Sequence, residues 1–206
     1  MKSGIGFDAS NYGYAVVEKS DMVFIPDPDT AVIDPFCSIP TLSMTGNAMI
    51  IANPENRPLA QYPRNIIKAA VEHMKNSGIA DEMKILPEFE FYLFDDVTWN
   101  VDGKHIGATV DASQSYCNSN TEGHGVVVAK QKNYHIAKPF DTSYECRSEM
   151  CLLMKDAGIE INYHHPEVAA SGQYEIEPQL GEVVHMADAS MMIKYIIHNV
   201  AKKYGM

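Results

Sequence analysis

The sequence is poor in arginine and has no long apolar run, and both shortages narrow the classes of protein that it can encode. Three of its 206 residues are arginine, and 27 acidic residues against 16 basic ones give a net charge of −11. Nucleic-acid-binding proteins need clustered Lys and Arg for phosphate contacts, so this composition argues against a nucleic-acid partner. It contains no stretch of 18 apolar residues, so no membrane span is expected.

The sequence also lacks paired cysteines. Its four cysteines form no CxxC motif, and their spacing resembles neither a zinc site nor a disulfide framework. We interpret them as reduced thiols, and the N-terminus has no apolar core of signal-peptide length. We therefore expect a cytoplasmic protein. Its net charge of −11 separately indicates an anionic surface that suits cations.

The order of strand-like and helix-like segments along the sequence predicts an α+β fold in two parts. Residues 1–58 are short extended pieces separated by prolines, which indicates a small β-rich domain. Residues 59–206 form the second part, in which 95–140 shows no convincing periodicity and is expected to be a long loop. The remaining elements predicted there are a helix at 63–77, a strand at 84–94, a helix opened by the capping box Thr142-Ser143-Tyr144-Glu145, strands at 159–165 and 172–178, and a helix at about 182–204.

Two of the predicted strands carry Glu-x-Glu in otherwise apolar segments. Because successive side chains of a strand alternate between faces, Glu88 and Glu90 in PEFEFYLF share one face, roughly 7 Å apart. Glu175 and Glu177 in GQYEIEP do the same. A solvated face would explain one such strand. Two strands, with Glu167 nearby, favour a shared cation, since buried unpaired carboxylates are costly.

Carboxylate oxygens are suitable ligands for hard ions such as Mg²⁺ and Mn²⁺. His164 and His165 lie between the two acidic strands and could add a ligand or hydrogen-bond a substrate. The alternative is that one of them packs in the core and the other is exposed. The residues themselves leave this choice open.

Several segments resemble the glutamine synthetase family, in the order in which the family has them. They are GFDAS (6–10), EKSDMVFIPDPDTAVIDPF (18–36), PEFEFYLFD (87–95), RSEMCLLM (147–154), HHPEVAASGQYEIE (164–177) and KYIIHNVAKKYG (194–205). The fifth is the most specific, and RSEMCLLM favours the bacterial type I-like branch. The resemblance implies an incomplete β-grasp-like domain over 1–58. It also implies the first part of the catalytic domain, an antiparallel sheet flanked by helices, over 59–206.

The resemblance further implies a reaction in nitrogen assimilation. ATP, glutamate and ammonia give glutamine, ADP and phosphate through γ-glutamyl phosphate, with ATP as co-substrate and two Mg²⁺ or Mn²⁺ ions. Members assemble as homo-oligomers, typically dodecamers. Because the family extends beyond both ends of this chain, we expect a truncated form with one metal site incomplete and no turnover alone. The alternative is an inactive family member that binds only metal or partner subunits.

Residue by residue, the resemblance assigns metal and substrate roles. Glu90, Glu167 and Glu175 match the ligands of the metal near the glutamate substrate, and Glu88 matches a ligand of the metal near ATP. Asp8 matches the catalytic aspartate that holds ammonium and helps to deprotonate it across a subunit interface. Asp21 is expected to support that pocket, and His165 is expected to bind substrate.

Some positions depart from the family pattern. Ala9 and Asn11 replace a usual Gly and Ser beside Asp8, and Pro166 stands where many relatives have His. The segment KQKNYHIAKPF differs from the corresponding family segment, so the nucleotide contacts stay unassigned. The resemblance gives no role to Glu177.

Overall fold

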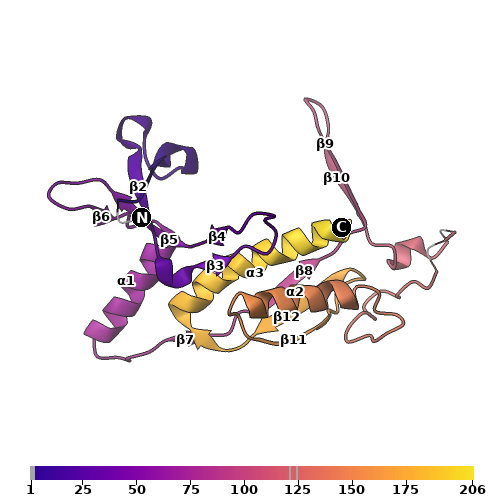
Figure 1. Ribbon diagram of the computed structural model, residues 1–206. Coiled ribbons are helices and arrows are strands. Elements are labelled where there is room, and N and C mark those ends of the chain that lie inside the picture. Colours follow the sequence, from indigo (N-terminus) through magenta and orange to yellow (C-terminus); the bar gives the residue numbers. More distant parts are fainter. Residues whose placement is uncertain (1–2, 121, 124) are drawn as a thin grey trace. The chain divides into compact units, whose positions relative to one another are not determined.

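The computed structural model describes residues 3–120, 122–123 and 125–206, and the chain divides into two units (Figure 1). The first comprises Met1–Ile85 with Gly181–Met191, and the second comprises Leu86–Leu180 with Met192–Met206. Helix α3, Val183–Lys203, contributes to both. These units are defined by the contacts between residues within the folded chain. They do not test the domain boundary at residue 58, which stays a prediction.

The first unit is built on a four-stranded antiparallel sheet in the order β1-β2-β5-β6. Its core contains the buried side chains of Ala9, Met22, Ala48 and Leu59. Gly46 begins a strand where a Cβ atom would lie 2.4 Å from the carbonyl oxygen of Ile25, so the two strands need glycine there. The strands are β1 Ile5–Asp8, β2 Asp21–Pro26, β5 Gly46–Ile50 and β6 Arg57–Pro58.

Helix α1, Pro63–Asn76, begins at the proline that predicted its start. Arg64 is buried in its first turn and bonds to Asp27, Asn47 and Asp188. The unit's other elements are the short 3-10 helices η1 Ala9–Tyr12, η2 Val17–Lys19 and η3 Pro28–Thr30, the ribbon of β3 Val32–Ile33 with β4 Leu42–Ser43, and the ribbon of β7 Lys84–Ile85 with β13 Gly181–Glu182.

The second unit contains a three-stranded antiparallel sheet in the order β11-β12-β8. Its strands are β8 Phe89–Tyr92, β11 Ile161–Pro166 and β12 Gln173–Pro178. The expected single strand over 84–94 is wrong, because Leu86–Glu88 separates β7 from β8. Proline at 87 has no N–H with which to continue a strand ladder.

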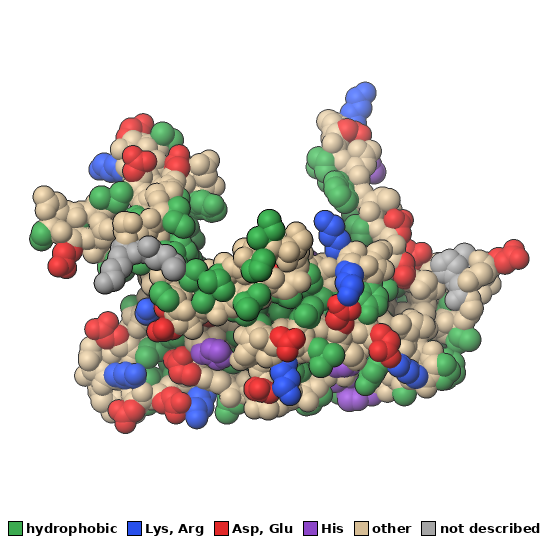
Figure 2. Space-filling view, viewed as in Figure 1, with side chains coloured by type: hydrophobic (Ala, Val, Ile, Leu, Met, Phe, Trp, Pro, Cys, Tyr) green, Lys and Arg blue, Asp and Glu red, His purple; other side chains and the backbone are tan. Residues whose placement is uncertain are grey.

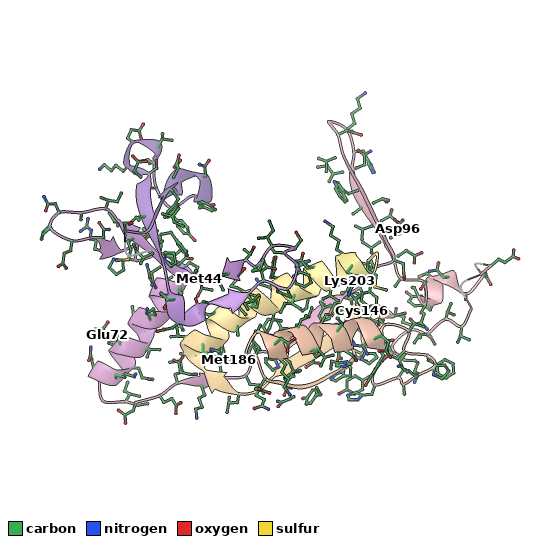
Figure 3. The ribbon with its side chains drawn as sticks, viewed as in Figure 1. Met44, Glu72, Asp96, Cys146, Met186 and Lys203 are labelled. Atoms are coloured by element: carbon green, nitrogen blue, oxygen red, sulfur yellow. The ribbon has the colours of Figure 1, made fainter. Side chains whose placement is uncertain are left out.

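Helix α2, Tyr144–Asp156, packs on this sheet through β11. The predicted capping box is wrong: Ser143 is the N-cap residue and makes no side-chain capping bond. Thr142 instead donates to Gln114, and Glu145 pairs with Lys138. An ion pair of 2.6 Å between Lys203 of α3 and Glu149 of α2 joins the C-terminal part of α3 to α2 (Lys203 is labelled in Figure 3).

A hairpin occupies part of the segment that was expected to be an irregular loop. Strands β9, Asp96–Val101, and β10, Ile106–Asp111, form an antiparallel ribbon that projects as a thin arm (Figure 1). Hydrophobic side chains run along the arm in Figure 2, and Trp99 is 74% exposed. Short 3-10 helix η4, Tyr116–Asn118, follows it.

These elements confirm the predicted α+β class, with antiparallel sheets and helices packed against them. Within the described part of the chain, we find no helix with both the length and the apolar character of a membrane span.

Candidate metal centre

The register of the three-stranded sheet gathers the acidic side chains that the sequence predicted. Strand β12 lies between β11 and β8, so that Glu175 is opposite His165 on one side and Glu90 on the other. Glu177, two residues further along the same face, is opposite Tyr163. Side-chain alternation on β12 therefore places both of its glutamates on one face of the sheet.

The opposite face of the same strands packs against helix α2. Tyr174, which alternates with Glu175, lies 4.4 Å from the Arg147 guanidinium. His164 of β11 also contacts Arg147, at 3.3 Å. Burial and Arg147 lower the pKa of His164. The sheet thus has a packed face toward α2 and an acidic face away from it.

His165, Glu167 and Glu175 form the first group on the acidic face. Their ligand atoms all lie within 4.8 Å of one another, and each residue is buried. His165 approaches Glu167 at 3.8 Å and Glu175 at 3.6 Å. Burial is the main cause of the raised pKa of Glu175, and nearby Glu167 and Glu88 raise it further. Carboxylates packed in this way would be stabilised by a cation.

Glu88, Glu175 and Glu177 form a second group with the same 4.8 Å limit. Asn162 Nδ2 donates to one Glu177 oxygen at 3.0 Å, and the Tyr163 hydroxyl donates to the other. These bonds lower the pKa of Glu177, and the bond to Glu177 is the main cause that raises the pKa of Tyr163 to about 12. Glu177, to which the resemblance assigned no role, is therefore held as a carboxylate beside Glu88.

Glu90 of β8 lies opposite Glu175 in the sheet and so is next to the first group. Its Oε2 accepts a hydrogen bond of 2.8 Å from the side chain of Gln173. The Gln173 amide oxygen in turn accepts from the backbone of Ala169, in the turn between β11 and β12. Gln173 thus links the carboxylate of β8 to the turn that follows Glu167.

Sequence reasoning named His165 but missed three other rings that lie beside these carboxylates. The imidazoles of His135 and His165 stack at 4.1 Å, and Tyr163 lies 5.7 Å from His165. Tyr134 contacts both imidazoles edge-on, at 4.3 and 5.5 Å. We call Tyr134, His135, Tyr163 and His165 the aromatic rim. The segment KQKNYHIAKPF carries two of the four rings, and no periodicity pointed to them.

Asp8 and Asp21 belong to the first unit, where they are paired in register at the end of β1 and the start of β2. Asp8 accepts bonds of 2.8 and 2.6 Å from the backbone and hydroxyl of Ser10. The Ser10 bonds lower the pKa of Asp8. The glutamates and His165 belong to the second unit, so the proposed roles of the two aspartates stay predictions.

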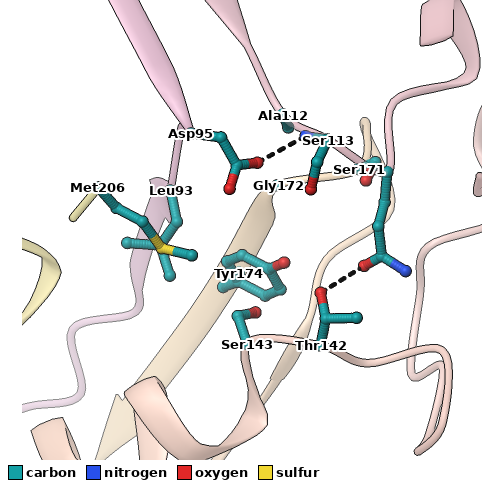
Figure 4. A pocket seen from close by; sticks show the side chains of 11 residues that line it. Leu93, Asp95, Ala112, Ser113, Thr142, Ser143, Ser171, Gly172, Tyr174 and Met206 are labelled. Carbon is teal, nitrogen blue, oxygen red and sulfur yellow. Dashed lines mark hydrogen bonds between the residues drawn. The ribbon is translucent and has the colours of Figure 1, made fainter. Parts of the chain in front are cut away.

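A small cavity in the second unit lies apart from the predicted site residues (Figure 4). Asp95, Ser113, Thr142, Ser143 and Tyr174 supply polar groups to its wall. Its volume is about 20 Å³, which is close to the room that one water molecule needs. It is too small for an amino acid or a nucleotide.

Two family descriptions match the sequence along most of its length. "Glutamine synthetase, catalytic domain" matches residues 60–206, and "Glutamine synthetase, beta-Grasp domain" matches residues 1–50. These matches confirm the resemblance and the two kinds of domain that it implied.

Named relatives match the whole chain. It is 38% identical to a 3-hydroxylaminophenol mutase of Cupriavidus pinatubonensis and 36% identical to a glutamine synthetase of Pasteurella multocida. The chain spans 44% of the length of each of these relatives. A cryo-EM structure of Plasmodium falciparum glutamine synthetase aligns with 98% of this chain and 40% of its own, at a TM-score of 0.82 and 26% identity.

Proposed function

The chain belongs to the glutamine synthetase family, and on that premise we propose that it contributes to ATP-dependent ligation of ammonia to glutamate. In this reaction a carboxylate oxygen of glutamate attacks the γ-phosphorus of ATP, and the bond to ADP breaks. Ammonia then attacks the acyl carbon of γ-glutamyl phosphate, and phosphate leaves as glutamine forms. The proposal includes nitrogen assimilation as the biological role and a homo-oligomer as the working assembly.

The gathering of carboxylates on one face of the β11-β12-β8 sheet is the observation that supports this proposal most strongly. The donor set is dominated by carboxylate oxygens with one imidazole, which fits Mg²⁺ or Mn²⁺. We propose that Glu90, Glu167 and Glu175 hold one ion and that Glu88 holds a second, with Glu177 beside it. Such ions, when bound, offset the repulsion between the two anionic reactants and polarise the transferring phosphoryl group.

The side chains of the chain itself have positioning and proton-transfer roles in this proposal. The Nδ1 atom of His165 lies 3.1 Å from the carbonyl oxygen of Pro166, and the stacked ring of His135 further fixes the imidazole. His165 is thereby oriented to hydrogen-bond substrate. Asp8, supported by Asp21, is proposed to hold the ammonium ion, because its lowered pKa keeps it ionised, and to help deprotonate that ion.

A binding test separates a metal centre from a merely acidic surface. Calorimetric titration of the chain with Mn²⁺ should give saturable binding, and Glu175→Gln should weaken it by at least about tenfold, since Glu175 belongs to both groups. The control is Glu72→Gln, which removes an exposed carboxylate of α1. Equal Mn²⁺ affinity in the chain and in Glu175→Gln would refute the metal centre.

A phosphate-release assay with ATP, glutamate, ammonium and Mg²⁺ addresses the alternatives. Phosphate release that requires all three substrates would support ligation, and Mn²⁺ binding without release would fit a family member that binds only metal or partner subunits. The relative named 3-hydroxylaminophenol mutase shows that family membership does not by itself fix the reaction. An amide-forming assay with glutamate is therefore required to support ligation.

A further inference from the structure

The turn between β11 and β12 is held by Asn133, an asparagine that belongs to no helix or strand. Asn133 is 2% exposed. Its Nδ2 donates to three backbone carbonyl oxygens, those of Glu167 at 3.0 Å, Ala170 at 3.2 Å and Gln173 at 3.0 Å. Buried polar groups need such partners, and here one side chain bonds to both ends and the middle of the turn. Asn133 therefore fixes the turn to the segment that carries it.

The backbone on both sides of Asn133 is in an unfavourable conformation. Within the described residues, the two residues other than glycine with a positive φ are Gln131 at +58° and His135 at +53°, each two positions from Asn133. Side chains with a Cβ atom rarely adopt this left-handed region, and they stay in it only where surrounding contacts hold them. The N–H of His135 supplies one such contact, donating to the carbonyl oxygen of Pro166 at 3.1 Å. The segment is thus shaped around Asn133 and held against the end of β11.

Asn133 also holds the backbone of Glu167, one of the proposed metal ligands. The Glu167 carbonyl oxygen accepts from Asn133, and the Glu167 N–H donates to the carbonyl oxygen of Gln173 at 2.9 Å. One carboxylate oxygen, Oε1, accepts from the N–H of Val168 at 2.8 Å, and the other, Oε2, lies 3.8 Å from His165 on the acidic face. The direction of Oε2 therefore depends on the conformation of the turn.

We propose that Asn133 is a positioning residue of the metal centre, which sets the direction of the Glu167 carboxylate through the turn between β11 and β12. This inference rests on the proposed function and adds to it a residue that touches neither ion nor substrate. Groups that orient a metal ligand change the metal affinity by about 10- to 100-fold when they are removed. Because Asn133 acts through the backbone, the lower end of this range is expected.

Calorimetric titration of the full chain with Mn²⁺ tests the proposal. Asn133→Ala removes the amide and should weaken Mn²⁺ binding about tenfold. The matched control is Asn65→Ala, because Asn65 is 8% exposed and its Nδ2 donates to the carbonyl oxygens of Ala48 and Leu59. Asn65 belongs to the first unit, which contains none of the proposed metal ligands. The control should lose stability in urea unfolding and keep its Mn²⁺ affinity.

A double-mutant cycle separates positioning from a general loosening of the second unit. Glu167→Gln removes the carboxylate that Asn133 is proposed to direct, so Asn133→Ala should cause little further loss of Mn²⁺ affinity in that background. Amide hydrogen exchange followed by NMR gives a second measurement, made without the ion. Asn133→Ala should speed the exchange of the Glu167 and Gln173 N–H groups and leave that of Ile176, in the middle of β12, unchanged.

The proposal is overturned if Asn133→Ala binds Mn²⁺ as tightly as the unsubstituted chain, or if the losses of affinity multiply in the double variant. Absence of Mn²⁺ binding in the unsubstituted chain refutes instead the metal centre of the proposed function. If Asn133→Ala does not fold, the unsubstituted chain decides. An ion that binds the oriented turn also stabilises it, so Mg²⁺ should slow hydrogen exchange of the Asn133 side-chain amide. Exchange that Mg²⁺ leaves unchanged overturns the proposal.

Discussion

Replacing Arg147 should be among the most damaging single changes in the second unit, although the residue lies on the face of the sheet away from the proposed metal centre. Its side chain is fully buried, and that of its partner Asp141 is 3% exposed. The two groups form a bidentate pair, and the guanidinium also donates to the Ser143 hydroxyl at 2.7 Å. Its plane lies over the ring of Tyr174.

The magnitude follows from the charge that would be left behind. Arg147→Met would preserve much of the volume but leave the Asp141 carboxylate buried without its cation. Breaking a buried ion pair in this way costs about 3–5 kcal/mol, against a typical domain stability of about 5–15 kcal/mol. The double change Arg147→Met/Asp141→Leu removes both charges, so it should cost much less than the sum of the two single changes.

Urea unfolding followed by circular dichroism measures these differences. Arg57→Met is the matched control, because Arg57 is exposed, and it should shift the free energy of unfolding by less than about 0.5 kcal/mol. The reasoning is refuted if Arg147→Met costs less than about 1 kcal/mol. It is also refuted if the costs of the two single changes simply add in the double variant.

Three further predictions concern other parts of the chain. Hydrogen bonding from Arg64 lowers the pKa of Asp27, so the stability lost in Asp27→Asn should be greatest above pH 3.8 and should narrow as pH falls through the folded pKa, as measured by urea unfolding. Met150→Ala should cost about 2–5 kcal/mol in the same assay, because Met150 is fully buried. Mn²⁺ at one hundred times its dissociation constant should stabilise the chain by about 2.7 kcal/mol, seen as a raised melting temperature that EDTA reverses.

The local pattern of β12 was sufficient to predict its two faces, whereas Glu88 lies outside β8. Alternation fixes which side chains share a side, so Glu175 and Glu177 could be grouped from the sequence alone. Alternation says nothing about which strands are neighbours, and the central place of β12 between β11 and β8 depends on contacts far apart in the chain. The grouping of Glu88 with Glu177 therefore required the structure.

The hairpin could have been predicted and was missed. Residues 97–101 and 106–110 alternate between apolar and polar, with Asp102-Gly103 between them, which is a typical turn signal. The oxygen of Asp102 accepts from the backbone of Lys104 and His105, as a turn aspartate should. The polar residues around these two segments made the alternation of apolar and polar positions hard to recognise in the sequence.

The aromatic rim illustrates what neither local pattern nor motif can supply. Tyr134 and His135 lie on no helix or strand, so no periodicity marks them, and their segment departs from the family where it could have been informative. A backbone hydrogen bond of 3.1 Å from His135 to the carbonyl oxygen of Pro166 ties this segment to the end of β11, beside the site. The contact lies beside Glu167 and Glu175, to which the resemblance assigned metal-binding roles. A family motif therefore predicts the carboxylates of this centre, whereas the chemistry of its neighbouring surface has to be read from contacts between unusual residues.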